Sequence, residues 1–258
     1  MFWPSFLSLA GVGLFGVVAF ALTAPKSLLD QLPIEGSRRK RLILGLQPAI
    51  LTILLAAAGA GVADRAASTS LIAGAAAGND LPEDWLTPLA VFLLVGIVLG
   101  AVLYLTDRWW KPWWSTPEDD DLIEAWRPPN VIAGVTYGGL TEEVLMRWGI
   151  MAVILWAAVS IAGSGGDPDL GSVWLAIVLS SLIFAAGHLP AAMLGRKRSA
   201  RFVVRILALN TLAGLLFGWL FWEWNLETAM AAHIGFHVGA AILVLAIRAG
   251  RESPAARS

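Results

Sequence analysis

Residues 85–106 read WLTPLAVFLLVGIVLGAVLYLT, a run of 22 residues without a charged side chain. A helix needs about 20 apolar residues to cross the hydrocarbon core of a bilayer, so this stretch is long enough to span it. Its apolar residues do not alternate with polar ones, as they would in a strand of a membrane barrel. Lipid offers the backbone no hydrogen-bond partners, and the stretch is therefore predicted to be a transmembrane helix.

Six further stretches share this length and apolar character. They lie at residues 2–23, 42–62, 130–162, 171–194, 202–221 and 228–247. Hydrophobic residues make up 57% of the chain and charged residues 14%, whereas a soluble domain carries about a quarter charged residues. The predicted fold class is all-α: a polytopic transmembrane helical bundle of about seven spanning helices (six to eight), forming a single integral membrane domain over residues 1–258. Residues 66–78 are too short to span and are expected to be re-entrant or interfacial.

Lysine and arginine residues predict the orientation of the helices. Sixteen of the 18 basic residues fall in every second loop or in the C-terminal tail, while Arg65 lies in another loop and Arg147 within a predicted helix. Because basic loops stay in the cytoplasm, we predict an N-terminus outside and a cytoplasmic C-terminus. The first stretch has no basic region before it, so we expect it to be retained. Short loops and many alanines are typical of the bacterial cell (inner) membrane, the expected localisation.

Composition also limits the chemistry. The chain has no cysteine, which excludes disulfides and thiol catalysis. Its net charge of −1 gives no indication of nucleic-acid binding. Glycine pairs four residues apart predict close helix packing in lipid. These pairs are Gly96 and Gly100, Gly134 and Gly138, Gly214 and Gly218, and Gly235 and Gly239.

Ionisable residues inside spanning helices are costly and point to a functional site. The fourth stretch contains Glu142, Glu143 and Arg147. Glu142 lies about 18 Å along a helix that starts at residue 130, deep in the membrane. Glu143 and Arg147 are four residues apart on one helix face, so this pair can neutralise itself. That leaves Glu142 without an obvious partner on its own helix.

All three histidines of the chain fall in predicted spanning stretches. His188 lies in the fifth, and His233 and His237 share one face of the seventh. A lone buried histidine, or a Glu–Arg pair at this spacing, is more often structural than catalytic. Two glutamates, an arginine and every histidine within three apolar helices are together better explained by a functional site, because each is costly in lipid.

These residue types favour a hydrolase that activates water. A carboxylate beside an imidazole can activate a water molecule for attack on a carbonyl carbon. Further donors can then stabilise the oxyanion that develops, and two histidines on one face of a neighbouring helix are plausible donors. No serine stands out as a nucleophile.

In order and in helix placement, these motifs resemble the CPBP intramembrane proteases, the family that includes the CAAX prenyl endopeptidases and the bacterial Abi proteins. The family pattern is Glu-Glu-x-x-x-Arg, then Phe-x-x-x-His, then His-x-x-x-Asn or a similar polar residue. This chain has Glu142, Glu143 and Arg147, then Phe184 and His188, then His233 with His237. The resemblance covers about residues 130–247, the expected catalytic core.

The resemblance implies an intramembrane glutamic endopeptidase with no obligatory metal cofactor. Glu142 and His188 would activate the water. His233 and His237 would form the oxyanion site, and Glu143 and Arg147 would orient these groups. The family's best-known members carry Asn at the position of His237, although both side chains can donate a hydrogen bond.

Two alternatives stay open from the residues. A zinc metalloprotease could use the same cluster, because zinc takes histidine nitrogen and carboxylate oxygen. Its ligands would be Glu142, His188, His233 and His237. A non-enzymatic protein, such as a membrane immunity or scaffold component or an ion path, could also carry the motif. The absence of apparent inverted repeats argues against transport.

The substrate class is only partly defined. We expect a membrane-associated or C-terminal-helix protein or peptide, with the lipid bilayer as the other partner. A prenylated protein, a pheromone or bacteriocin precursor, and a C-terminal sorting helix all fit.

The positions of the histidines along their helices set a geometric condition. His188 lies toward the inner end of its helix and His233 toward the outer end of its own. The two can meet only if a helix tilts or breaks, and Gly187 and Pro190 would permit a break. We expect the carboxylates and histidines to converge near mid-membrane, with Glu142 within about 10 Å of His188.

Overall fold

The computed structural model describes residues 1–114, 128–162, 168–193 and 199–252. Within these ranges the chain is helical and contains no strand. Seven of the described helical segments are long and apolar enough to cross a membrane, which confirms the predicted fold class. Five basic residues counted for the orientation lie outside the described residues: Arg127, Arg196, Lys197, Arg198 and Arg257.

The spans are built from continuous and interrupted helices. The N-terminal ones are α1 (Phe2–Thr23), α3 (Ser37–Val62) and α5 (Leu86–Trp114), with the short α2 (Lys26–Leu29) and α4 (Leu71–Ala76) between them. The fourth span combines α7 (Pro128–Ala133), η2 (Gly134–Glu142), η3 (Val144–Met151) and α8 (Ala152–Ala162). The others are α9 (Leu170–Gly187) with α10 (Leu189–Met193), α11 (Ala200–Glu223) and α12 (Leu226–Glu252).

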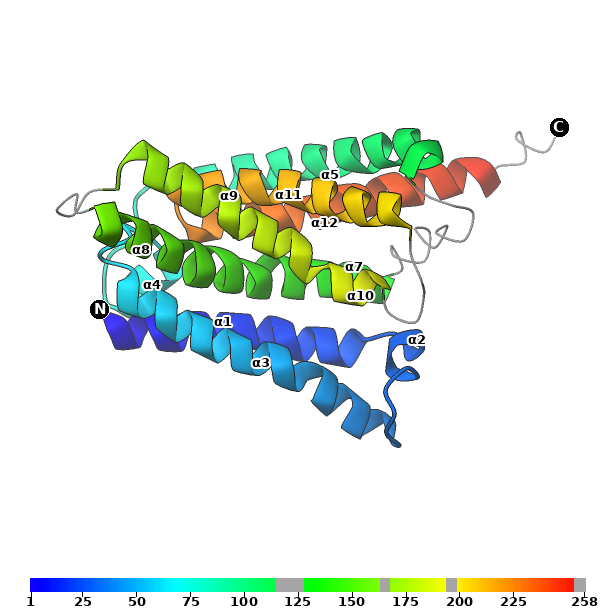
Figure 1. Cartoon of the computed structure of the whole chain (residues 1–258), viewed down its shortest axis with the longest axis horizontal. Coiled ribbons are helices and arrows are strands. Elements are labelled where there is room, and N and C mark those ends of the chain that lie inside the picture. Colours follow the sequence, from blue (N-terminus) through cyan, green and yellow to red (C-terminus); the bar gives the residue numbers. More distant parts are fainter. Residues whose placement is uncertain (115–127, 163–167, 194–198, 253–258) are drawn as a thin grey trace.

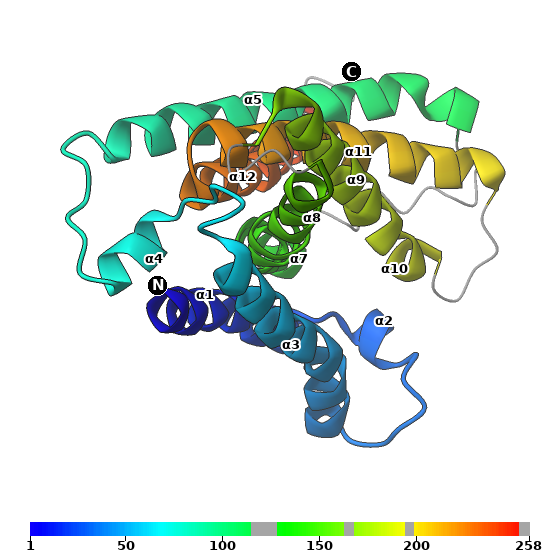
Figure 2. The ribbon, with the colours of Figure 1, turned by 60° about the vertical axis from the view of Figure 1, so that its left-hand side comes forward.

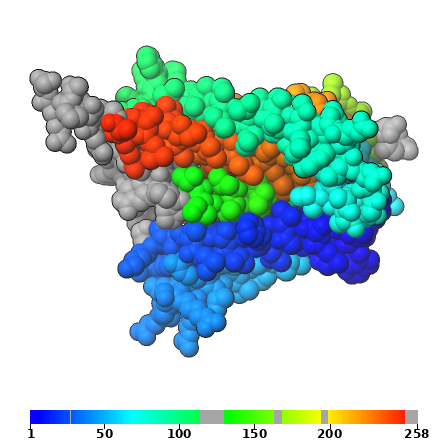
Figure 3. Space-filling view, turned by 180° about the vertical axis from the view of Figure 1, so that it is seen from behind, coloured from blue at the N-terminus to red at the C-terminus, as the bar shows by residue number. Residues whose placement is uncertain are grey.

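The fourth span occupies the centre of the bundle. Figure 2 views it nearly end-on, with α1 and α3 on one side and α5, α11 and α12 on the other. From behind, part of it is visible as a green strip between α1 in blue and α12 in orange to red (Figure 3). The motif glutamates therefore lie on the element that the other spans surround.

The start of α1 and the end of α12 lie at opposite ends of the bundle (Figure 1), as an odd number of spans requires. The side of the membrane that each end faces stays a prediction from the basic residues. Several spans are longer than predicted: α3 begins at Ser37 rather than residue 42, and α5 ends at Trp114 rather than residue 106. These extensions contain basic and tryptophan side chains, which are enriched at the membrane–water interface.

The fourth span departs from the α-helix that its sequence predicts. From Gly134 to Met151 it is π-helical, interrupted at Glu143. A π-helix closes i→i+5 hydrogen bonds and has a wider turn than an α-helix, and it occurs most often at functional sites. The widened stretch carries the Glu-Glu-x-x-x-Arg motif.

The fifth span breaks where the sequence allows it. α9 ends at Gly187, His188 caps its C-terminus, and α10 begins at Leu189. The main-chain N–H of His188 still bonds to Ala185 and Ala186. The break places His188 at a bend rather than within a straight helix.

Helices α5 and α12 run in the same direction and touch through glycines. A Cβ on Gly96 would lie 2.0 Å from the carbonyl oxygen of Ala232, and one on Gly100 would lie 2.0 Å from that of Phe236. Neither distance is possible for a real Cβ, so the two backbones meet only because these residues are glycine.

The contact is reciprocal. A Cβ on Gly235 would lie 2.2 Å from the carbonyl oxygen of Leu93, and one on Gly239 would lie 2.0 Å from that of Ile97. Two of the predicted glycine pairs thus belong to one interface. Because α12 carries both His233 and His237, this interface fixes the depth of the two histidines in the bundle.

The short segment at residues 66–78 forms α4, which does not span. Its N-terminus is held by Glu227 of α12, whose carboxylate accepts from Leu71 N at 2.8 Å and Ile72 N at 3.0 Å. Ser70 Oγ donates to the same carboxylate at 2.6 Å. A negative side chain at a helix N-terminus is stabilising, so α4 is pinned to the start of α12.

We expect Gly100→Ala to destabilise the protein by at least 1–3 kcal/mol, the order of magnitude for overpacking, because its Cβ would collide with the Phe236 carbonyl. Unfolding in detergent can be followed by the intrinsic fluorescence of the 13 tryptophans. Gly61→Ala is the matched control, since a Cβ there meets no atom within 4 Å. Equal melting temperatures for the two variants would contradict the proposed contact.

Candidate active site

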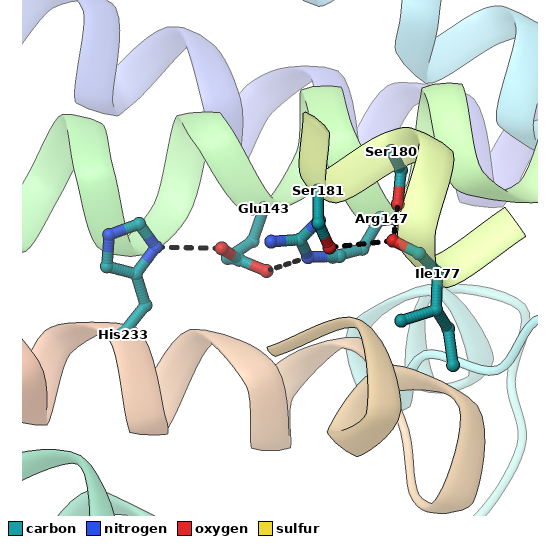
Figure 4. Close-up of polar contacts among 6 residues, drawn as sticks. All are labelled: Glu143, Arg147, Ile177, Ser180, Ser181 and His233. Atoms are coloured by element: carbon teal, nitrogen blue, oxygen red, sulfur yellow. Dashed lines mark hydrogen bonds and ion pairs between the residues drawn. The ribbon is translucent and has the colours of Figure 1, made fainter. Parts of the chain in front are cut away.

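Glu143, in the middle of the fourth span, is hydrogen-bonded to two other side chains (Figure 4). Glu143 Oε2 accepts a hydrogen bond from Arg147 Nε at 3.1 Å, and Glu143 Oε1 lies 2.7 Å from Nδ1 of His233. Glu143 and Arg147 are completely buried, and His233 nearly so. A buried charge needs such partners, and this carboxylate therefore ties the fourth span to α12.

The hydrogen bonds fix the tautomer of His233. A carboxylate paired with a guanidinium only accepts, so His233 donates through its Nδ1–H. The other ring nitrogen, Nε2, lies 3.2 Å from Nε2 of His237. The two rings are nearly parallel, with centroids 5.1 Å apart and an angle of 18° between their planes. The two Nε2 atoms therefore meet at one point, where a proton can be shared between them.

His237 fits against the backbone of η2. A Cβ on Gly134 would lie 2.5 Å from Nδ1 of His237, and one on Gly138 would lie 2.7 Å from its Nε2. Any larger residue at these positions would displace the imidazole. The predicted pair Gly134 and Gly138 thus makes room for a side chain of the site.

Glu142 faces a different histidine. Its Oε1 lies 3.9 Å from Nε2 of His188, just beyond hydrogen-bonding distance. His188 Nδ1 lies 2.8 Å from the carbonyl oxygen of Phe184, which can only accept, so Nδ1 carries a proton. In the neutral ring, the lone pair of Nε2 is then on the side of Glu142. Both side chains keep some exposure, 34% for His188 and 18% for Glu142, so water can reach them.

Two phenylalanines hold the rings in place. Phe217 of α11 stacks on His233 with centroids 4.5 Å apart and an angle of 19°. Phe184 meets His188 edge-on at 4.6 Å and His233 edge-on at 5.9 Å. The guanidinium carbon of Arg147 lies 5.5 Å from the centre of the Phe184 ring, within the range of a cation–π contact.

Arg147 is only partly satisfied by these contacts. Its Nη1 and Nη2 are buried and have no hydrogen-bond partner among the described residues. The neighbouring Ser180 and Ser181 hydroxyls both donate to the Ile177 carbonyl, at 3.1 and 2.6 Å (Figure 4). A buried N–H group without a hydrogen-bond partner is costly. We therefore infer that Arg147 is present because the buried carboxylate of Glu143 needs a cation, and not because it stabilises the fold in general.

A cavity of about 790 Å³ adjoins the site. Its wall includes four of the candidate residues: Glu142, His188, His233 and His237. Glu143 and Arg147 are not part of the wall and lie behind it. Leu51 of α3 also lines the cavity. The geometry separates side chains that can touch a substrate from those that can only position others.

The structure brings together all six residues that the sequence singled out. The separation of 3.9 Å between Glu142 and His188 satisfies the expected limit, and the break after Gly187 makes it possible. Phe217 could not be recognised from the sequence, because an aromatic residue in an apolar span looks like ordinary packing. Nor did the sequence indicate that Glu143, rather than Glu142, would bind His233.

A zinc site was the alternative left open by the sequence. The described ranges contain no group of three or more His, Cys, Asp or Glu side chains placed to hold a metal ion. The expected independence of a metal cofactor stays a prediction.

Residues 124–239 match the family model of type II CAAX prenyl endopeptidases, Rce1-like. The match covers most of the predicted core at 130–247 and confirms the resemblance that the motifs suggested. No curated protein and no solved structure matches the chain significantly. Helices α1 and α3 lie outside the matched residues.

Arg147→Met should destabilise the protein by about 3–5 kcal/mol, because it leaves a buried carboxylate without its cation. The double variant Glu143→Gln with Arg147→Met removes both charges. Its loss of stability should be smaller than the sum of the losses in the two single variants. The unfolding free energies of wild type, the two single variants and the double variant, read from tryptophan fluorescence in one detergent, form a double-mutant cycle. Strictly additive losses would show that the two side chains do not depend on each other.

Proposed function

Since residues 124–239 match the Rce1-like model of type II CAAX prenyl endopeptidases, we propose that the protein is an intramembrane glutamic endopeptidase. It hydrolyses a peptide bond of a membrane-associated protein or peptide with a water molecule activated by Glu142 and His188. The observation that carries this proposal is the pairing of these two residues on the wall of one cavity, with His233 and His237 on the same wall.

The gap between Glu142 and His188 suits a bridging water. Oε1 and Nε2 are 3.9 Å apart, too far for a direct hydrogen bond but close enough for one water to bond to both. The carboxylate takes a proton from the water, and the hydroxide attacks the scissile carbonyl carbon. When the C–N bond breaks, the leaving amine takes a proton from the site, and the carboxylate is restored.

His233 and His237 are suited to the oxyanion. Their Nε2 atoms are 3.2 Å apart, so a carbonyl oxygen on the cavity side of both atoms would lie near two potential donors. His233 can donate a hydrogen bond from each ring nitrogen only as an imidazolium cation. The carboxylate of Glu143, which accepts from Nδ1, stabilises that cation. Donors fixed in advance stabilise the developing charge without reorganisation, and the ring stacking of Phe217 on His233 supplies that rigidity.

Glu143 and Arg147 act as positioning residues in this scheme. They do not reach the cavity, and their hydrogen bonds set the orientation of His233. The chain is a multi-pass membrane protein, and we propose that it lies in a bacterial cell membrane with its C-terminus in the cytoplasm.

Glu142→Gln should abolish cleavage while the variant still folds in the membrane, since a carboxamide cannot take the proton from water. The cleavage rate should fall by at least about 10²- to 10⁴-fold, the usual contribution of a general base. Glu223→Gln is the control, because Glu223 is exposed at the far end of α11 and should have no effect.

The measurement is mass spectrometry of membrane peptides from cells that express each form, together with cleavage of a farnesylated CAAX peptide in liposomes. Wild-type rates in the Glu142→Gln variant would rule out the proposed role of this residue.

The proposed chemistry needs no metal. We expect protein purified without a histidine tag to keep its activity after treatment with a chelator and to contain less than one equivalent of zinc. Elemental analysis and the peptide assay on the same sample check both points. Loss of activity on chelation, restored by stoichiometric zinc, would contradict the proposal and favour a zinc protease.

A further inference from the structure

The residue before Glu142 makes a hydrogen bond that leaves its own span. Thr141 is fully buried, and its hydroxyl donates to the main-chain carbonyl of Gly13 in α1 at 2.7 Å. Nothing in the proposed chemistry uses this contact, and α1 lies outside the residues that match the protease family. The bond therefore ties a helix without an assigned role to the residue beside the proposed general base.

The direction of this bond is unusual for a hydroxyl within a span. A threonine or serine inside a helix commonly donates to a carbonyl of the preceding turn of the same helix. Such bonds, to the carbonyl four residues earlier, occur here at Thr23, Thr52, Thr136 and Ser160. The acceptor of Thr141 is instead 128 residues away in the chain, so its hydroxyl joins two helices.

Glycines of α1 allow the two helices to approach so closely. A Cβ on Gly16 would lie 2.2 Å from the hydroxyl oxygen of Thr141 and 2.5 Å from the carbonyl oxygen of Thr136. A Cβ on Gly13 would lie 2.5 Å from the side chain of Thr52 in α3. Figure 2 shows α1 and α3 together on one side of the fourth span. Because no side chain separates α1 from the fourth span here, Thr141 is held at a fixed place.

Three consecutive residues of the fourth span thus face three neighbouring helices. Thr141 donates to α1, and Glu143 accepts from His233 of α12. Between them, Glu142 lies 3.9 Å from His188, and its carboxylate makes no direct hydrogen bond to a described residue. Consecutive side chains of an α-helix point about 100° apart, so fixing the residues on both sides fixes the direction of the middle one. The direction of the Glu142 carboxylate is therefore set by its two neighbours.

The bond from Thr141 also lies within the π-helical part of the fourth span, Gly134–Glu142. Long π-helical stretches are rare, so the surrounding helices must hold this one in its wider turn. Relaxation to an α-helical turn would change the direction of the side chains that follow and would turn Glu142 away from His188. A hydrogen bond from the end of the π-helix to α1 opposes that change.

We propose that Thr141 is a positioning residue, whose bond to α1 keeps Glu142 directed at the water that it shares with His188. The inference rests on the proposed endopeptidase function, and it extends the active site to a helix outside the family match. Thr141 is fully buried and does not line the cavity, so it acts only through Glu142.

Thr141→Val keeps the shape of the side chain and removes its hydroxyl. With a farnesylated CAAX peptide in liposomes, kcat per folded protein should fall by about 10- to 100-fold, the effect of a small displacement of a reacting group. KM should stay nearly unchanged. Thr141→Ser keeps the donor and should restore most of kcat. The matched control is Thr52→Val, the same change at another fully buried threonine, whose hydroxyl bonds within α3; it should keep the wild-type kcat.

A change in α1 alone should have the same effect. Gly16→Ala places a methyl group against the Thr141 hydroxyl and should lower kcat at an unchanged KM. Gly11→Ala is its control, since a Cβ there meets no atom within 4 Å. This pair replaces Thr141→Val if that variant does not fold. A purely structural role would lower the yield of folded protein and leave its kcat at the wild-type value, a result that would overturn the inference.

A labelling experiment separates the inference from the proposed function. The chain has no cysteine, so Glu142→Cys introduces a single thiol, and its reaction with a water-soluble methanethiosulfonate reports whether position 142 faces the cavity. Adding Thr141→Val should slow this reaction by about 2- to 10-fold, the equilibrium effect of one hydrogen bond, whereas adding Thr52→Val should not. This result supports the inference even if wild type cleaves no peptide, which would count against the proposed function alone. Equal labelling with and without Thr141→Val contradicts the inference.

Discussion

The carboxylate of Glu143 is the centre on which the site depends. It is fully buried, and it accepts from Arg147 on its own span and from His233 on α12. Lipid supplies no water to replace either partner, so all three side chains must be present together. The bond to Nδ1 of His233 turns the other ring nitrogen toward the cavity wall and toward His237. One interaction thereby sets the tautomer and the direction of the His233 ring.

Backbone packing brings these groups to the same level. The reciprocal glycines of α5 and α12 fix α12 along its axis, and Gly134 and Gly138 leave room for the ring of His237. The break after Gly187 swings His188 toward Glu142. Helices carry Glu142, His233 and His237, and His188 caps the end of α9, which is the preorganised arrangement that catalysis requires.

Much of this could be predicted from the sequence, because lipid restricts the possibilities so strongly. The spans followed from apolar length, and the site from the rarity of charge inside them; Glu142 and His188 meet as expected. The π-helical turn of the fourth span could not be predicted, since its residues also suit an α-helix. The ion pair between Arg205 and Asp107 could not be predicted either, because the two residues are 98 positions apart and lie on different helices.

An experimental structure in lipid, at a resolution that shows ordered waters, tests the central claim most directly. We expect one water molecule within hydrogen-bonding distance of both Oε1 of Glu142 and Nε2 of His188, open to the cavity. A separation of more than about 10 Å between these side chains, or protein atoms filling the space between them, would contradict a shared role in activating water.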